Sequence, residues 1–259
     1  MASSDELHPH RRFSRRVDNY VRYRPSYPPE VLAIIEAEIG LTPTAAIADV
    51  GSGTGIFTRL LLDYGCTVFA VEPNAEMRAA AEASLAGYPR FHSVAGDAGD
   101  TTLPVATVDV VTAAQAFHWF DGEAARREFL RILRPGGAVV LVYNSWRDSD
   151  DPLAEAYDAL INLFDPEREM GEAAPRAGDE DIAAFYGTGG FGRRDIPNPH
   201  WYNWDAFQGR ALSSSYAPLP GHPNHEPFLA GLRSFFDAHA EQGRIRFPYV
   251  TRLYWGRPG

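Results

Sequence analysis

Short apolar runs alternate with segments of helical spacing along the first 145 residues of this chain of 259 residues. Runs that are apolar throughout are typical of strands buried on both faces of a parallel sheet. The segments between them carry apolar residues at helical spacing, and most end at glycine, as crossover helices do. The expected strands are 46–50, 67–71, 91–95, 108–113 and 138–143, and the expected helices are 30–39, 56–64, 75–85 and 122–133. The alternation predicts a doubly wound α/β sheet of the Rossmann-like kind.

The regular alternation of apolar runs and helical segments ends after residue 145. Residues 165–190 are expected to form a mobile loop with one helical piece. The other expected elements are helices at 153–164, 204–212 and 227–240 and strands at 191–197 and 248–255. The last two strands suit a hairpin added at the sheet edge. We expect one domain over 1–259, made of an N-terminal segment (1–29), a core (30–147) and C-terminal insertions and strands (148–259).

Composition excludes several classes of protein. The net charge of −10 argues against a dedicated nucleic-acid or anionic-membrane binder. One cysteine, Cys66, excludes a disulfide framework and a cysteine-based zinc site. His222 and His225 are separated by a proline in a loop, so no metal site is expected. With neither a long apolar run nor a signal-peptide core, we expect a cytoplasmic protein outside the membrane.

The sequence Asp49-Val-Gly51-Ser-Gly53-Thr-Gly55 follows the first expected strand and opens a helix. Glycines at alternate positions let the backbone turn sharply and approach a ligand closely. In an open α/β sheet, ligands bind at the carboxyl ends of the strands, where this loop falls. The dinucleotide fingerprint G-x-G-x-x-G would need a third glycine at position 56, which is Ile56. A nicotinamide cofactor is therefore disfavoured.

Two acidic residues follow the next two strands. Glu72 ends the second strand, where an acid accepts hydrogen bonds from both hydroxyls of a ribose. Asp97 follows the third strand, where a carboxylate suits an adenine amino group. Together with the glycine loop, these acids predict a nucleoside site.

These residues resemble the class I S-adenosylmethionine-dependent methyltransferases. The segment Ala114-Gln-Ala-Phe-His-Trp-Phe-Asp121 looks like the fourth motif of that family, in the form found in the branch of trans-aconitate methyltransferase-like enzymes, and Arg134-Pro-Gly-Gly137 looks like its turn before strand five. The resemblance implies the sheet order 3-2-1-4-5-7-6 with an antiparallel last strand. It also implies S-adenosyl-L-methionine as cofactor, bound by Tyr20, Arg24, Asp49, Gly51, Ser52, Gly53, Thr54, Gly55, Glu72, Pro73, Met77, Gly96, Asp97, Ala98, Gln115, Ala116 and Phe117.

In that family the N-terminal segment covers the cofactor, and the Arg24 guanidinium suits the cofactor carboxylate. His118 follows the fourth strand and is the candidate general base, with a packing role as the alternative. Aromatic residues that could line a substrate pocket are Tyr27, Trp119, Phe120, Tyr143, Trp146, Trp201, Trp204 and Tyr216. His118 is expected to border the same pocket.

The expected activity is methyl transfer to a small-molecule acceptor at a carboxylate or hydroxyl oxygen, leaving S-adenosyl-L-homocysteine. A carboxylate acceptor needs no general base. Three alternatives remain: a nucleic-acid or protein methyltransferase on the same fold, a nicotinamide-dependent oxidoreductase, and a non-catalytic protein that binds a nucleoside cofactor. We expect a monomer or a homodimer with no nucleic-acid partner.

Overall fold

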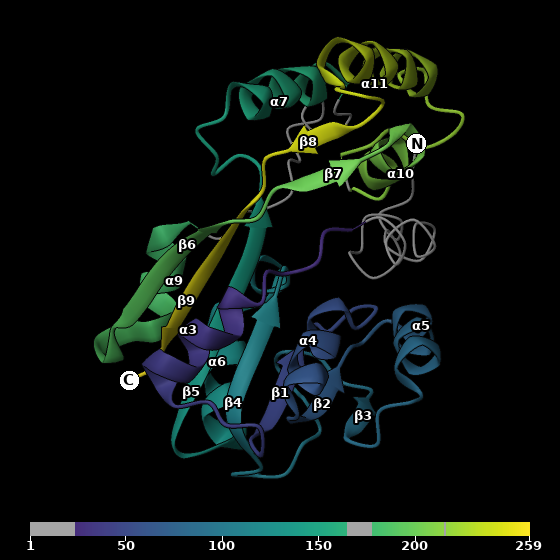
Figure 1. The fold of residues 1–259 in the computed structure, drawn as a ribbon. Helices are drawn as coiled ribbons and strands as arrows, with labels where there is room; N and C mark the ends of the chain where they lie inside the picture. The colour runs from purple at the N-terminus through teal and green to yellow at the C-terminus, as the bar shows by residue number, and fades with distance from the viewer. Residues whose placement is uncertain (1–23, 165–177, 215) are drawn as a thin grey trace.

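The computed structural model describes residues 24–164, 178–214 and 216–259, and a seven-stranded sheet runs through its lower part (Figure 1). The strands are β1 (Ala46–Val50), β2 (Thr67–Val71), β3 (Phe91–Val94), β4 (Val108–Ala114), β5 (Leu133–Ser145), β6 (Phe191–Pro197) and β9 (Val250–Gly256). They lie in the order β3-β2-β1-β4-β5-β9-β6. Strands β1 to β5 pair in parallel, and β9 runs antiparallel to both β5 and β6. This order confirms the predicted 3-2-1-4-5-7-6 topology with an antiparallel last strand.

Helices cover both faces of the sheet because its strands are apolar on both faces. Adjacent strand residues face opposite ways, so Ile47 and Ala48 of β1 belong to different hydrophobic clusters. One cluster packs the sheet against α3 (Glu30–Ile39), α4 (Ile56–Tyr64) and the end of α5 (Ala75–Leu85). The other packs it against α6 (Gly122–Ile132) and α9 (Asp179–Tyr186). The result is the doubly wound α/β arrangement that the sequence predicts.

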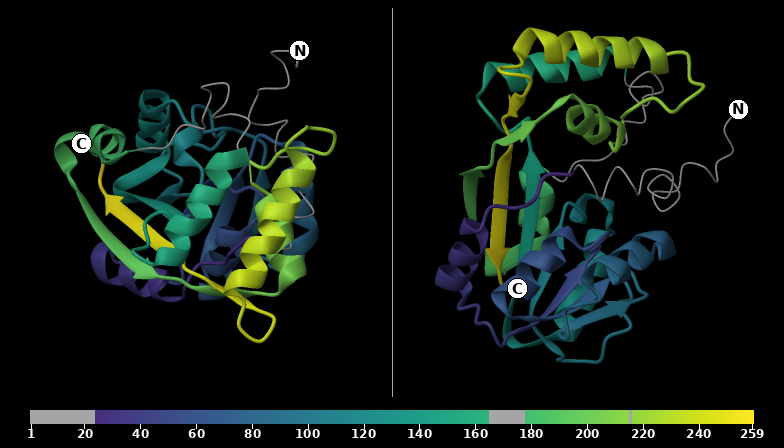
Figure 2. Two further views of the ribbon diagram at one scale, coloured as in Figure 1. Left: turned by 90° about the horizontal axis from the view of Figure 1, so that it is seen from above. Right: turned by 45° about the vertical axis from the view of Figure 1, so that its right-hand side comes forward.

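A second layer of structure, which we call the cap, lies above the carboxyl ends of β4 and β5 (Figures 1 and 2). It consists of α7 (Pro152–Phe164), β7 (His200–Tyr202), α10 (Trp204–Leu212), α11 (His225–His239) and β8 (Ile245–Phe247). Strands β7 and β8 pair as a separate antiparallel sheet, and aromatic residues of the cap form their own core. None of the helices in the described ranges combines the length and apolarity needed to cross a membrane.

Several expected boundaries differ from the structure. Strand β5 begins at Leu133 rather than 138, because Leu133 pairs with Val108 across a register shift. The expected helix at 227–240 begins earlier, at His225, and ends at His239. Strands β7 and β8 are too short for their pattern to stand out, and the sequence did not predict them. The expected helical piece within 165–190 is α9, whereas residues 165–177 lie outside the described part of the chain.

Candidate functional site

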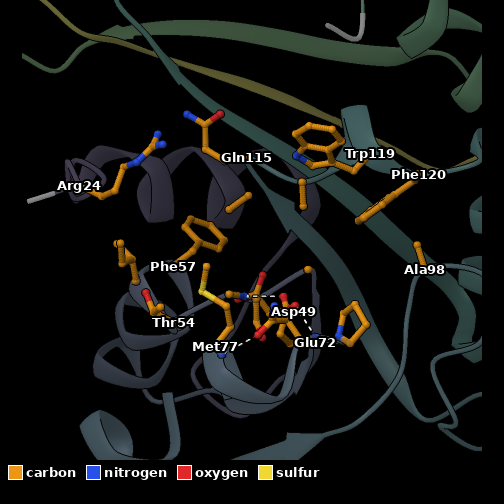
Figure 3. A pocket seen from close by; sticks show the side chains of 18 of the residues that line it. Arg24, Asp49, Thr54, Phe57, Glu72, Met77, Ala98, Gln115, Trp119 and Phe120 are labelled. Carbon is orange, nitrogen blue, oxygen red and sulfur yellow. Dashed lines mark hydrogen bonds between the residues drawn. The ribbon is translucent and has the colours of Figure 1, made fainter. Parts of the chain in front are cut away.

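A cavity of about 380 Å³ lies at the carboxyl ends of the parallel strands, beneath the cap (Figure 3). Most of the residues predicted from the cofactor resemblance line it, namely Arg24, Asp49, Gly51, Ser52, Gly53, Thr54, Glu72, Pro73, Met77, Asp97, Ala98, Gln115 and Ala116. Of the predicted substrate residues, Tyr27, Trp119, Phe120 and Trp146 also line it. One cavity therefore brings together the N-terminal stretch, the segments at the carboxyl ends of the five parallel strands, and Tyr249 just before β9.

The glycine loop turns below this cavity through left-handed backbone conformations. Gly51 has φ +70°, and a Cβ built there would stand 2.5 Å from the Cβ of Ala116. Gly53 has φ +57°, but a Cβ at that position would meet nothing within 4 Å. Gly51 thus allows the loop to approach the segment after β4, and Gly53 leaves open space at the cavity surface.

Asp49 is buried at the end of β1, where it holds the loop from beneath. Its two carboxylate oxygens accept hydrogen bonds from the hydroxyls of Thr58, at 2.6 Å, and Thr112, at 2.8 Å. Burial raises the pKa of Asp49 to about 6, against the lowering effect of the two threonine donors; the charge of Glu72 adds to the rise. Asp49 is therefore a structural carboxyl group that ties β1 to α4 and β4.

Glu72 projects from the end of β2 into the same region (Figure 3). One carboxylate oxygen accepts a hydrogen bond from the Gly53 amide at 3.0 Å, and the other accepts from the Asn74 amide at 2.9 Å. Asn74 in turn caps α5 by accepting from the amides of Glu76 and Met77. Since each carboxylate oxygen can accept more than one hydrogen bond, Glu72 is held in place and can still receive two adjacent hydroxyl groups.

Asp97 occupies the matching place after β3. Its Oδ1 accepts hydrogen bonds from the amides of Gly99, at 2.8 Å, and Asp100, at 2.9 Å. This local turn holds the carboxyl group at the cavity wall beside Ala98. Glu72 and Asp97 thus line one cavity from two neighbouring strand ends.

The short 3-10 helix Phe117–Trp119 decides which side chains after β4 reach the cavity. Three residues make one turn of such a helix, so consecutive side chains point in three directions. Trp119 lines the cavity, whereas His118 and Phe117 line a second, adjoining cavity of about 650 Å³. The structure therefore places His118 in the wall of the second cavity, with its ring tilted against those of Trp119 and Tyr143.

Other predicted residues lie behind the cavity wall. A Cβ at Gly55 would stand 2.7 Å from Leu85 Cδ1, so this glycine permits α4 to pack on α5. Gly96 is part of a tight turn, since a Cβ there would stand 2.9 Å from two carbonyl oxygens. Tyr216 packs against the ring of Trp146, and its hydroxyl lies 3.1 Å from that of Tyr157. Tyr20 lies outside the described residues.

The sequence analysis missed four informative lining residues: Phe57, Asn74, Asn144 and Tyr249. Asn144 lies near the carboxyl end of β5. Because ligands bind at the carboxyl ends of parallel strands, the reasoning that predicted Glu72 could also have predicted Asn144. Tyr249 comes just before β9, whose antiparallel direction brings its start to the same sheet edge. Finding it requires the direction of β9 to be known.

The segment that enters α3 crosses this edge and is fixed by polar contacts. Arg24 donates hydrogen bonds to the hydroxyl and carbonyl of Ser213, each at 3.1 Å. The carbonyl of Ser26 accepts from the side-chain amides of Asn198, at 2.9 Å, and Asn144, at 3.3 Å. Arg24 and Tyr27 therefore line the cavity from a segment that is tied to both the sheet and the cap.

Comparison with known families and proteins points to one class. Residues 48–141 match the family described as a methyltransferase domain. An uncharacterised methyltransferase of Mycobacterium tuberculosis is 38% identical over 169 residues, which cover 64% of this chain and 60% of that protein. An uncharacterised methyltransferase-like protein of Schizosaccharomyces pombe is 33% identical over 153 residues, covering 59% of this chain and 58% of that protein. The chain thus matches about 60% of the length of these relatives.

The fold also matches solved structures. A protein of Anaeromyxobacter dehalogenans, described as a candidate type II methyltransferase, superimposes with a TM-score of 0.62 at 23% identity. The match covers 91% of this chain and 98% of the other. At this level of identity the likeness concerns the fold, and it extends over the cap as well as the sheet.

Proposed function

We propose that this chain, which belongs to the class I methyltransferase family through its residues 48–141, transfers a methyl group from S-adenosylmethionine to a small-molecule acceptor. The observation that carries the proposal is a single cavity with two unlike ends. Glycine-loop residues, Glu72 and Asp97 line one end, and Trp119, Trp146 and Tyr249 line the other. A donor and an acceptor can therefore meet within one enclosed space.

The residues at the loop end fit the methyl donor. Glu72 presents a fixed carboxylate to the two ribose hydroxyls, and Asp97 is available to the adenine amino group. The buried hydroxyl of Thr54 has no hydrogen-bond partner among the described residues, so it is available to a bound ligand. Met77 and Phe57 add apolar surface to the cavity wall (Figure 3). Hydroxyl, amino and apolar parts of a nucleoside each have a matching surface.

S-adenosylmethionine, when bound, supplies a methyl group on a sulfonium that is a good leaving group. The protein then has to align the acceptor and exclude water. The segment 24–27, held by Asn144, Asn198 and Ser213, covers the cavity on one side. The aromatic residues Trp119 and Trp146 cover it toward the cap. Catalysis in this proposal depends on enclosure and orientation.

We place the acceptor atom at an oxygen. An acceptor carboxylate is already a nucleophile at neutral pH and needs no base. His118, the predicted base, lines the second cavity, which favours an acceptor that needs no deprotonation. The hydroxyls of Tyr27 and Tyr249 belong to cavity-lining residues and can orient an acceptor oxygen.

The direct test is transfer of a labelled methyl group from S-adenosylmethionine to pooled small carboxylic acids and phenols, with Glu72→Gln as the matched inactive variant. We expect label in an organic-extractable product with the parent protein and a strong reduction with the variant. Label that enters only added protein or nucleic acid would favour the corresponding macromolecular methyltransferase. Cofactor binding without transfer to any pool would leave a non-catalytic binding protein.

A further inference from the structure

The cap buries an arginine among aromatic rings. Arg210 lies on α10 and is only 1% exposed. Its guanidinium carbon lies between 4.2 and 5.2 Å from the centroids of four rings, those of Phe247, Trp146, Tyr157 and Tyr249. Ring faces attract a cation, but they do not neutralise its charge. An arginine stays protonated in proteins, so this buried site is positively charged.

The guanidinium has no anionic partner among the residues that the structure describes. Its Nε donates a hydrogen bond to the hydroxyl of Tyr249, while the buried Nη1 has no acceptor in the described part of the chain. No carboxylate in residues 24–164, 178–214 or 216–259 forms an ion pair with Arg210. Buried charges are ordinarily paired, because an unpaired one loses its hydration without compensation. The cap therefore holds a cation with no counter-charge among the described residues.

A second donor nearby is in the same situation. The indole Nε1 of Trp146 is buried and has no acceptor among the described residues. The indole ring lies 4.7 Å from the Arg210 guanidinium carbon, measured to the ring centroid. Two donors without acceptors on side chains that contact each other are explained together by one missing acceptor.

These donors adjoin the cavity. Trp146 and Tyr249, which contact Arg210, both line it, and both come from the sheet edge beneath the cap. Arg210 is thus one side chain removed from the cavity, at the end away from the glycine loop. A group bound there would belong to the acceptor rather than to the donor.

We propose that the methyl acceptor carries a carboxylate group that is bound at the Trp146 and Tyr249 wall of the cavity, by the Trp146 indole N–H and by the charge of Arg210 behind these rings. This inference rests on the proposed function and specifies its acceptor. A carboxylate supplies the missing acceptor oxygens, and its negative charge is complementary to the Arg210 guanidinium. The aromatic surroundings favour an apolar monocarboxylate.

The neighbouring Tyr216 shows that this place favours negative charge. Burial raises the pKa of Tyr216, but the Arg210 charge and the hydrogen bonds from Ser214 and Tyr157 outweigh it and bring the pKa below its usual value. A tyrosinate at Tyr216 would itself neutralise Arg210. The test must therefore distinguish an acceptor carboxylate from an internal anion.

The experiment measures thermal stabilisation, with S-adenosylhomocysteine present, by monocarboxylates from acetate to phenylpropionate, each paired with its primary amide. The variants are Arg210→Met, which removes the charge while filling similar space, and Trp146→Phe, which removes only the N–H donor. Arg147→Met is the matched control, because Arg147 also contacts the Trp146 ring, at 4.5 Å, but is paired with Asp158.

We expect at least one acid to bind the parent and Arg147→Met more tightly than its amide. Arg210→Met should weaken that acid about ten-fold or more, and Trp146→Phe by less. The melting temperature of Arg210→Met without ligand should be unchanged or higher, since replacing an unpaired buried charge by an apolar group relieves its desolvation. The affinity of Arg210→Met for S-adenosylhomocysteine should stay within about two-fold of the parent, because Arg210 lies outside the donor end.

Three results would overturn the inference: acids binding no better than their amides, a preference for acids that survives in Arg210→Met, or ultraviolet titration showing a tyrosinate in the free protein at neutral pH. Failure of the proposed function gives a different result, since the parent would then not bind S-adenosylhomocysteine at all.

Discussion

The two ends of the cavity differ in how their polar groups are satisfied. At the glycine-loop end, the carboxylates of Asp49, Glu72 and Asp97 each accept two hydrogen bonds from nearby donors. At the cap end, Arg210 Nη1 and Trp146 Nε1 are buried with no acceptor among the described residues. The Thr54 hydroxyl is the exception at the loop end. Within the described residues, the polar groups of the loop end are largely paired with one another, whereas the cap end has a cation without a paired anion.

This difference reflects how each end is assembled. The loop end uses contacts within and between adjacent strand-to-helix connections, as when Glu72 binds the amides of Gly53 and Asn74. The cap end gathers Trp146, Arg210 and Tyr249 from three distant segments. Under the proposed function, the preformed end suits a cofactor shared by many enzymes, and the end with unpaired donors suits the part that selects an acceptor.

The largest effect on ligand affinity is expected from a substitution that fills the space occupied by the glycine loop. Gly51→Ala places a Cβ 2.5 Å from Ala116 in a left-handed conformation, so the backbone must move. Overpacking and strain together predict a loss of affinity for S-adenosylhomocysteine of about 100-fold or more by calorimetry. Gly53→Ala, with open space around its Cβ, should lose about ten-fold or less.

Gly40→Ala is the remote control for this pair. Gly40 also has a positive φ, at +73°, with nothing near its Cβ, but it ends α3 away from the cavity. It should lower stability by about 1 kcal/mol and leave affinity unchanged. Equal affinity of Gly51→Ala and the parent would show that the loop is not preformed for a ligand.

The next effect concerns the carboxylate after β2. Glu72→Ala should weaken S-adenosylhomocysteine binding by about 1.5–3 kcal/mol, the worth of hydrogen bonds to a charged group. Calorimetric titration measures it, with the exposed Glu38→Ala on α3 as control. If the variant binds S-adenosylhomocysteine as tightly as the parent does, Glu72 does not contribute to cofactor binding.

A third effect appears in stability rather than in binding. Burial raises the pKa of Asp49 from 3.8 to about 6, so at intermediate pH the folded chain holds a proton that the unfolded chain has lost. The stabilisation from this proton is full below about pH 4 and is lost as the pH rises through about 6. Between pH 4 and 7, the free energy of unfolding of the parent should therefore fall by about 1–3 kcal/mol more than that of Asp49→Asn.

Denaturant unfolding at a series of pH values measures this difference, with the exposed Asp150→Asn as control. Parallel pH profiles for the parent and Asp49→Asn would mean that Asp49 is ionised throughout this range.

The smallest effect should come from the segment that spans both ends. Asn198→Ala removes a hydrogen bond of 2.9 Å to the Ser26 carbonyl, worth about 1 kcal/mol. Since Arg24 and Tyr27 line the cavity, affinity for S-adenosylhomocysteine should fall by about two- to five-fold. Asn162→Ala, which breaks a similar bond within α7, should leave it unchanged. If Asn198→Ala and Asn162→Ala bind S-adenosylhomocysteine equally well, the position of the segment 24–27 does not affect binding in the cavity.

Local sequence was sufficient for the sheet and for most of the loop end. Apolar strands followed by Gly51, Glu72 and Asp97 mark the sheet edge directly, because the carboxyl ends of parallel strands meet there. His118 shows where such reasoning fails: it follows β4, yet one step along a 3-10 helix turns it to the second cavity. Position after a strand predicts the neighbourhood of a side chain but not its direction.

The cap end was out of reach of the sequence for a different reason. Arg210 lies in an ordinary amphipathic helix, and nothing in its local pattern distinguishes it from a surface arginine. Its burial depends on β8, whose Phe247 contacts it, and on Tyr249. Long-range pairing therefore created the feature that bears most on the acceptor.

Calorimetric titration of the parent protein with S-adenosylhomocysteine, and separately with NAD, tests the central claim most directly. The arrangement of the glycine loop, Glu72 and Asp97 predicts saturable binding of one S-adenosylhomocysteine per chain and no comparable binding of NAD. A folded protein that binds NAD tightly, or that does not bind S-adenosylhomocysteine, would contradict the account.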